Sequence, residues 1–248
     1  MSLIPDAKLE ELTRFARLLA DAAGQAILPH FRLPVSVDNK AQAGFDPVTI
    51  ADRNGETAMR ALIEQHFPDH GIIGEEHGVK PSRSGFNWVL DPVDGTRSFI
   101  IGIPLWTTLI GLTFEGKPVL GLMNQPFVGE RFTGSRLGSF WERGQERKRL
   151  QVNPAASLKD AKLTTVAPEI YKSPRQKEVL ARMTSAVRMT RYGGDAYFFC
   201  LLAAGLVDVA MDAGLETYDI AALVPIMENA GGVVTTFDGL PATGGGDR

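Results

Sequence analysis

Two aspartates three residues apart, Asp91 and Asp94, stand where an apolar run meets a turn signal. The β-prone run at 88–90 predicts a strand, and Pro92 and Gly95 predict that the chain leaves the sheet at Asp91 in a sharp turn. Open α/β sheets bind their ligands at the carboxyl ends of their strands. Carboxylate, carbonyl and water oxygens are the ligands that Mg²⁺ accepts. This strand end is therefore typical of a metal site.

The turn also presents backbone groups to a ligand. The Val93 carbonyl is available to a cation, and the amides of Gly95 and Thr96 are available to an anion such as phosphate. Taken alone, the hexapeptide DPVDGT at 91–96 fits an Asx turn that caps a helix at Thr96 equally well. The other acidic segments of the chain decide between the two interpretations.

Three further segments place carboxylates next to a strand end or a helix start. They are Glu75 and Glu76 after the apolar run 72–73, Asp52 three residues after the helix-start residue Thr49, and Asp219 at the start of an apolar helical run. Singly, these residues have ordinary explanations, since loop glutamates are usually solvated and an aspartate often caps a helix. Their order along the chain gives them a joint meaning.

The order of these segments resembles that of the inositol monophosphatase family of metal-dependent phosphatases. DPVTIAD at 46–52, GEE at 74–76, DPVDGT at 91–96 and YDIAA at 218–222 match the family's motifs over most of the chain. The resemblance implies a mixed α+β and α/β fold, namely a layered α/β/α/β/α sandwich of the inositol monophosphatase and fructose-bisphosphatase type. It also implies a homodimer and Mg²⁺ as cofactor, with two or three ions in each active site.

The resemblance assigns roles to individual residues. The implied metal ligands are Glu75, Asp91, the Val93 carbonyl, Asp94 and Asp219. The implied catalytic residues are Asp52 and Thr96, which match the pair that orients the attacking water, together with Glu75. Asp46 and Glu76 belong to the same motifs, and Glu76 is expected to lie behind the ligands. Two divalent ions can activate a water and neutralise the entering and leaving oxygens of a phosphoryl group, so no Cys or His nucleophile is required.

The residues after DGT bear on the substrate. Inositol-preferring members usually carry Thr-Asn at this point, whereas this chain has Arg97 and Ser98. This variation resembles the histidinol-phosphate phosphatase branch of the family, as does YGGDAY at 192–197. We therefore hypothesise L-histidinol phosphate as the substrate.

A cationic amino alcohol needs negative charge opposite its ammonium group. Asp212 and Glu216 could supply that charge, and Asp195 could receive a hydroxyl or the imidazole. The full set of expected substrate contacts is Gly95, Thr96, Arg97, Asp195, Asp212 and Glu216. Two alternatives stay open: a phosphatase for inositol phosphate or another sugar or nucleotide phosphate, and a phosphate-metabolite-binding regulatory protein without turnover.

Composition excludes other classes of protein. The net charge of −3 gives no general attraction to nucleic acid, and the basic run 143–149 is interleaved with glutamate and is expected to be a solvated hairpin loop. The four histidines lack metal-ligand spacing, and Cys200 lies in an apolar helical run where a buried thiol is expected. A single cysteine and the lack of a signal or apolar spanning segment predict a cytoplasmic protein without membrane association.

Hydrophobic periodicity outlines the elements that must position these residues. We expect helices at 6–31 and 49–66, hairpin strands at 107–114 and 119–124, a continuing sheet at 130–141, strands at 163–168, 187–192, 207–211 and 232–236, and helices at 176–183, 196–204 and 218–230. The pattern divides the chain into an α+β part at 1–154, with most metal motifs, and an α/β part at 155–248, which contributes Asp219 and the substrate loop.

Overall fold

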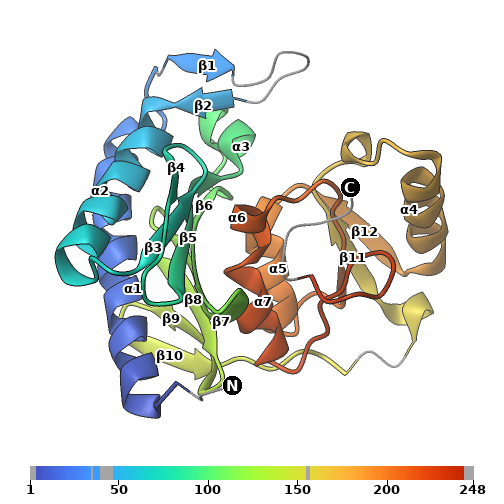
Figure 1. Cartoon of the computed structure of the whole chain (residues 1–248). Helices are drawn as coiled ribbons and strands as arrows, with labels where there is room; N and C mark the ends of the chain where they lie inside the picture. Colours follow the sequence, from blue (N-terminus) through green and yellow to red (C-terminus); the bar gives the residue numbers. More distant parts are fainter. Residues whose placement is uncertain (1–3, 35, 40–46, 155–156, 243–248) are drawn as a thin grey trace.

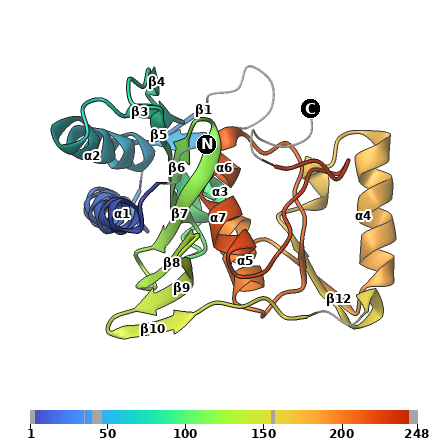
Figure 2. The same cartoon turned by 60° about the horizontal axis from the view of Figure 1, so that its bottom comes forward.

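The computed structural model describes residues 4–34, 36–39, 47–154 and 157–242. It shows five layers (Figures 1 and 2). Helices α1 (Asp6–Ile27) and α2 (Ile50–His66) cover one face of a large sheet, and α5 (Asp195–Ala203), α6 (Thr217–Ile220) and α7 (Leu223–Glu228) cover the other. A small sheet and α4 (Pro174–Ala186) follow on the outside. The expected α/β/α/β/α sandwich is confirmed.

Both N-terminal helices form for the reasons that the sequence gives. Apolar residues that recur every three or four positions along α1 are buried: Leu9, Leu12, Ala16, Leu19, Ala23 and Ile27. A short 3₁₀ turn, η1 (Leu28–His30), ends this helical segment. Helix α2 begins at a capping box, in which the Thr49 hydroxyl and the Asp52 carboxylate satisfy backbone amides of the first turn. The minor strands β1 (Val37–Asn39) and β2 (Pro47–Thr49) lead into it.

The large sheet has the order β10-β9-β8-β7-β6-β5-β3-β4. Its strands are β3 (Gly71–Gly74), β4 (Gly78–Lys80), β5 (Phe86–Asp94), β6 (Thr107–Phe114), β7 (Lys117–Gln125), β8 (Glu130–Ser135), β9 (Gly138–Arg143) and β10 (Glu146–Arg149). Neighbouring strands are antiparallel except β3 and β5, which are parallel. The basic run 143–149 is a hairpin with exposed side chains, but its second arm is the strand β10 and not a loop, because its backbone pairs with β9.

Strand β5 corrects one expectation. The chain does not leave the sheet at Asp91, because Asp91 pairs with Leu109 and Asp94 pairs with Thr107, with a register shift between them. A bulge tolerates Pro92, which has no amide proton for the ladder. The Thr108 hydroxyl donates to the Pro92 carbonyl at 2.8 Å, and the turn comes only after Asp94.

The small sheet is parallel and has the order β12-β11-β13. Its strands are β11 (Lys162–Thr165), β12 (Met189–Tyr192) and β13 (Val209–Ala210), with 3₁₀ turns η2 (Leu158–Asp160) and η3 (Pro168–Ile170) beside them. Helices α5 to α7 lie between this sheet and the large one (Figure 1). The boundary at residue 154 stays a prediction.

Two expectations in this part of the chain are wrong in detail. The helix expected at 218–230 is divided into α6 and α7, because Pro225 lacks the amide proton that a continuous helix needs and is tolerated in a first turn. The strand expected at 232–236 is reduced to one bridge between Thr235 and Pro241. Val233 is 87% exposed, so its apolar character does not reflect burial in a sheet.

Three glycines on adjacent strands let α6 and α7 lie directly on the large sheet. A Cβ atom at Gly111, Gly121 or Gly134 would meet backbone atoms of Ala221, Ala222 or Ile226. The close approach places α6, and with it Asp219, near the end of β5 (Figure 1). The strands thus position a residue that is distant in sequence from them.

We predict that Gly121→Ala destabilises the chain by about 1–3 kcal/mol, because the added methyl group would overlap the Ala222 carbonyl and push α7 from the sheet. Urea unfolding followed by circular dichroism measures the change. An unchanged midpoint would contradict the tight helix–sheet contact.

Candidate active site

Three carboxylates converge at the end of β5. Asp91, Asp94 and Asp219 each offer one oxygen, and these oxygens lie within 4.8 Å of one another. The β5 bulge supplies the first two residues, and α6 supplies the third. The Ala196 amide donates to Asp94 Oδ2 at 2.7 Å, and the Glu216 amide donates to Asp219 Oδ2 at 2.7 Å. Backbone groups of α5 and α6 therefore orient two of the three carboxylates.

The electrostatics of this cluster are unfavourable without a cation. Asp91 is 2% exposed, and its Oδ1 atom is buried with no hydrogen-bond partner among the described residues. Burial, followed by the charges of Glu75, Asp94 and Asp219, raises the pKa of Asp91 well above its usual value. Burial and the charges of Asp195 and Asp219 raise the pKa of Asp94 in the same way. An unpaired buried oxygen among hard oxygen donors fits a divalent cation such as Mg²⁺.

Glu75 lies next to the cluster, immediately after β3. Its amide donates to the Leu90 carbonyl at 3.2 Å, which extends the parallel pairing of β3 with β5 and brings Glu75 beside Asp91. It does not belong to the group of three whose oxygens lie within 4.8 Å. Its negative charge nevertheless contributes to the raised pKa of Asp91 and of Asp52.

Asp52 and Thr96 meet on the α2 side of the cluster. The Thr96 hydroxyl lies 3.5 Å from Asp52 Oδ1 and 3.1 Å from the Val93 carbonyl, and it can donate its single proton to only one of them. The Thr49 hydroxyl and amide donate to the other Asp52 oxygen at 2.6 and 2.9 Å. Burial raises the pKa of Asp52 against these hydrogen bonds, which lower it. The two expected water-orienting residues are thus brought together.

A cavity of about 170 Å³ adjoins the acidic cluster, and Asp94, Asp195, Asp212 and Asp219 are among its lining residues. Asp195 has a φ of +44° and accepts a hydrogen bond from Ser98 Oγ at 3.0 Å. It lies against Gly95, where a Cβ atom would come within 2.7 Å of Asp195 Oδ2. Glycine is required at position 95 because its φ of +83° disfavours other residues and because a side chain would collide with Asp195. The sequence did not reveal the contact with Asp195.

The remaining predicted substrate residues differ in position. Asp212 Oδ1 accepts hydrogen bonds from the Thr165 hydroxyl and the Val166 amide, both at 2.9 Å, and burial raises the pKa of Asp212 to about 7. Glu216 is exposed, caps α6 and is not among the residues that line the cavity.

Another predicted substrate residue, Arg97, is not among the residues that line the cavity. Arg97 is exposed, and its charge lowers the pKa of Asp195 against the effect of burial. Asp46 lies outside the described residues.

One buried carboxylate of this region was missed from the sequence. Glu56, on α2, is 0% exposed and accepts hydrogen bonds from the backbone that follows Glu75. Its spacing of four residues from Asp52, on the same helix face, was the signal that could have revealed it.

Comparison with known proteins agrees with this geometry. The model of the inositol monophosphatase family matches residues 8–246. The chain therefore belongs to the inositol monophosphatase family, whose phosphatases depend on Mg²⁺. The chain is thus a metal-dependent phosphatase of this family, and its three converging aspartates agree with that chemistry.

Individual relatives differ in name. The chain is 38% identical over 240 residues to a bifunctional phosphatase, the chloroplastic IMPL2 of Arabidopsis thaliana. The matched region covers 96% of this chain and 68% of the relative. The chain is also 36% identical over 222 residues to the histidinol-phosphatase of Chlorobaculum parvum, covering 89% and 84%. Among solved structures, an inositol monophosphatase from Zymomonas mobilis matches with a TM-score of 0.83 and 38% identity, covering 95% of this chain and 91% of the other.

None of the helices in the described ranges has the length and apolar character that crossing a bilayer requires.

The raised pKa of Asp91 predicts how the stability of the metal-free chain depends on pH. A carboxyl whose pKa rises on folding above its usual 3.8 stabilises the fold fully below that value, and this contribution is lost as pH rises through the folded-state pKa. In EDTA, we therefore expect the melting temperature to fall as the pH rises above the usual carboxyl pKa of 3.8, and to fall less in Asp91→Asn. Equal slopes in both proteins would contradict the repulsion within the cluster.

Proposed function

We propose that the protein is a two-metal Mg²⁺-dependent phosphate monoester hydrolase whose substrate is L-histidinol phosphate. The observation that carries the metal-dependent part is the convergence of Asp91, Asp94 and Asp219, where Asp91 Oδ1 is buried and has no hydrogen-bond partner within the described part of the chain. Hard, buried, mutually repelling oxygens are the arrangement that a divalent cation stabilises. Membership in the inositol monophosphatase family supports the same chemistry.

The donor set divides between two ions in this proposal. Glu75, Asp91 and the Val93 carbonyl would hold one Mg²⁺, and Asp91, Asp94 and Asp219 would hold the second. When bound, the ions supply a lowered pKa for water and neutralise charge on the phosphoryl oxygens. Without metal, the Val93 carbonyl and Asp52 compete for the single proton of the Thr96 hydroxyl. A cation bound to the Val93 carbonyl would therefore favour the contact of Thr96 with Asp52.

The chain's own groups orient the reactants. Asp52, whose second oxygen is held by Thr49, is placed to accept a proton through the Thr96 hydroxyl from the attacking water. The amides of Gly95 and Thr96, at the start of α3 (Thr96–Ile100), are placed to donate to a phosphate oxygen. These contacts align the ester with the water and need no covalent intermediate.

The choice of a cationic alcohol is supported by the cavity beside the cluster. Asp195 and Asp212 line it in addition to the proposed metal ligands Asp94 and Asp219. Burial raises the pKa of both residues, so a ligand ammonium or imidazolium there would favour their charged forms. The histidinol-phosphatase of Chlorobaculum parvum points to the same substrate.

A second candidate substrate is an inositol phosphate. It is supported by the similarity of this chain to the inositol monophosphatase of Zymomonas mobilis, which is 38% identical in sequence. A neutral polyol would donate hydroxyl hydrogen bonds to Asp195 and Asp212 and would gain less from their charge than a cation, because it carries no positive charge of its own. Glu216 is exposed and does not line the cavity, so it does not discriminate between the two candidate substrates.

We predict that the specificity constant kcat/KM is larger for L-histidinol phosphate than for inositol 1-phosphate. In Asp195→Asn we expect the value for histidinol phosphate to fall by about tenfold or more, because a charge-assisted contact is lost, and the value for inositol phosphate to fall less. Phosphate release in Mg²⁺ buffer measures both. A preference for the inositol ester in the native chain would overturn the substrate assignment and leave the phosphatase assignment standing.

The proposed ligand role of Asp91 predicts a second result. Mg²⁺ at about 100 times its dissociation constant should stabilise the native chain by about 2.7 kcal/mol, since binding favours the folded state. Asp91→Asn should lose most of this gain, although the metal-free variant should be as stable as the native chain or more so, because one repelling charge is gone. Thermal unfolding with and without Mg²⁺ tests this. An equal Mg²⁺-dependent shift in both proteins would show that Asp91 is not a ligand.

A further inference from the structure

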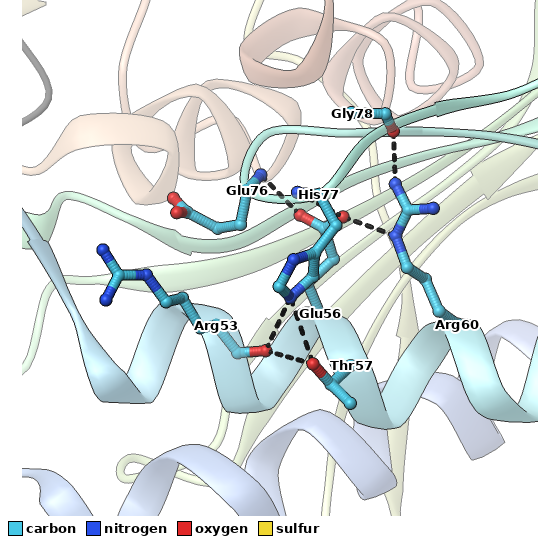
Figure 3. Close-up of polar contacts among 7 residues, drawn as sticks. All are labelled: Arg53, Glu56, Thr57, Arg60, Glu76, His77 and Gly78. Atoms are coloured by element: carbon cyan, nitrogen blue, oxygen red, sulfur yellow. Dashed lines mark hydrogen bonds and ion pairs between the residues drawn. The ribbon is translucent and has the colours of Figure 1, made fainter.

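A buried carboxylate on α2 holds the loop that follows β3. Glu56 is 0% exposed and lies one helical turn after Asp52 on the same buried face of the helix. Figure 3 shows its carboxylate between α2 and the backbone of Glu76 and His77. Helix α2 thus presents two buried carboxylates toward one region of the molecule, and the proposed function uses only the first.

The loop donates two successive amides to Glu56. The Glu76 amide lies 2.7 Å from Oε2, and the His77 amide lies 3.1 Å from Oε1. Arg60 donates to Oε1 at 2.6 Å and also contacts the Gly78 carbonyl (Figure 3). Arg60 compensates the charge of Glu56, so this buried group is paired and hydrogen-bonded as a buried charge must be.

Further contacts leave the loop little freedom. The His77 ring lies 3.1 Å from the Thr57 hydroxyl and 3.3 Å from the Arg53 carbonyl, both on α2. At the start of the loop, a Cβ atom on Gly74 would collide with Glu56 Oε1. The carboxylate is thus packed directly against the loop backbone and does not reach it through solvent.

Glu75 lies between two fixed points. Its own amide donates to the Leu90 carbonyl, one residue before Asp91, and the next two amides donate to Glu56. The Glu75 backbone is therefore held on one side by strand β5 and on the other by helix α2. The position of its carboxylate relative to Asp91 depends on both contacts.

We propose that Glu56, supported by Arg60, is a positioning residue that holds Glu75 in place to bind Mg²⁺. The inference rests on the proposed function, in which Glu75 is a metal ligand. Because α2 also carries Asp52, one rigid helix then sets the positions of the metal-binding loop and of the residue that accepts the water's proton. Groups that orient metal ligands in this way commonly change metal affinity by about 10- to 100-fold.

Geometry and charge make different predictions for two variants. Glu56→Asp keeps the negative charge but is one methylene too short to reach both amides. Glu56→Gln keeps the length but turns a donor toward groups that are themselves donors. If Glu56 acts only through its charge, the aspartate variant binds Mg²⁺ as the native chain does. If it acts by position, both variants are impaired.

Isothermal titration of the full-length, metal-free chain with Mg²⁺ tests the proposal. We expect both variants to bind Mg²⁺ about 10- to 100-fold more weakly, with circular dichroism spectra that match the native chain. At saturating Mg²⁺, kcat should return to within about threefold of the native value, because Glu56 does not touch the reacting groups.

Glu142→Gln is the matched control. Glu142 accepts a hydrogen bond from Arg17 at 2.7 Å in a partly buried ion pair on β9, near the opposite end of the large sheet from β3. This variant should keep the native Mg²⁺ affinity. Native affinity in both Glu56 variants, or an equal loss in Glu142→Gln, would overturn the positioning role. If a Glu56 variant does not fold, the other variant decides. A native chain that binds no Mg²⁺ would instead contradict the proposed function.

Discussion

The structure depends on the repulsion among buried carboxylates at the end of β5. Burial and the acidic neighbours raise the pKa values of Asp91 and Asp94. One oxygen of Asp91 also has no hydrogen-bond partner among the described residues. Such a cluster opposes folding unless protons or cations neutralise it. We infer that function explains why the chain tolerates it, because the same property that destabilises the metal-free site gives it affinity for Mg²⁺.

The surrounding elements hold this cluster together from distant parts of the chain. The bulge in β5 turns two aspartates toward the same side, and a row of glycines lets α6 approach the sheet and add Asp219. Helix α2 contributes Asp52 directly and, through Glu56, the loop that carries Glu75. The rigid sheet and helices therefore supply the precision that a site of oxygen ligands needs, since flexible carboxylates would separate.

Local signals in the sequence predicted the elements that local forces determine. The capping box of Thr49 and Asp52 and the hairpin of β6 and β7 follow from the spacing of a few neighbouring residues. The five-layer fold and the acidic motifs were predictable because a family resemblance joined segments that lie far apart in sequence. The division of 218–230 into two helices was signalled by Pro225, but its consequence depends on packing against the sheet.

Contacts between residues far apart in the chain could not be predicted from the sequence. Pro92 predicts the end of a strand, and only the pairing of β5 with β6 shows that a bulge accommodates it. The contact of Asp195 with Gly95 joins residues far apart along the chain, and the role of Glu56 depends on a loop from another strand.

Anomalous scattering from a crystal grown with Mn²⁺, a close substitute for Mg²⁺ at oxygen sites, tests the central claim most directly. We expect anomalous peaks in contact with Asp91. Peaks only elsewhere, or none at saturating Mn²⁺, would contradict the account.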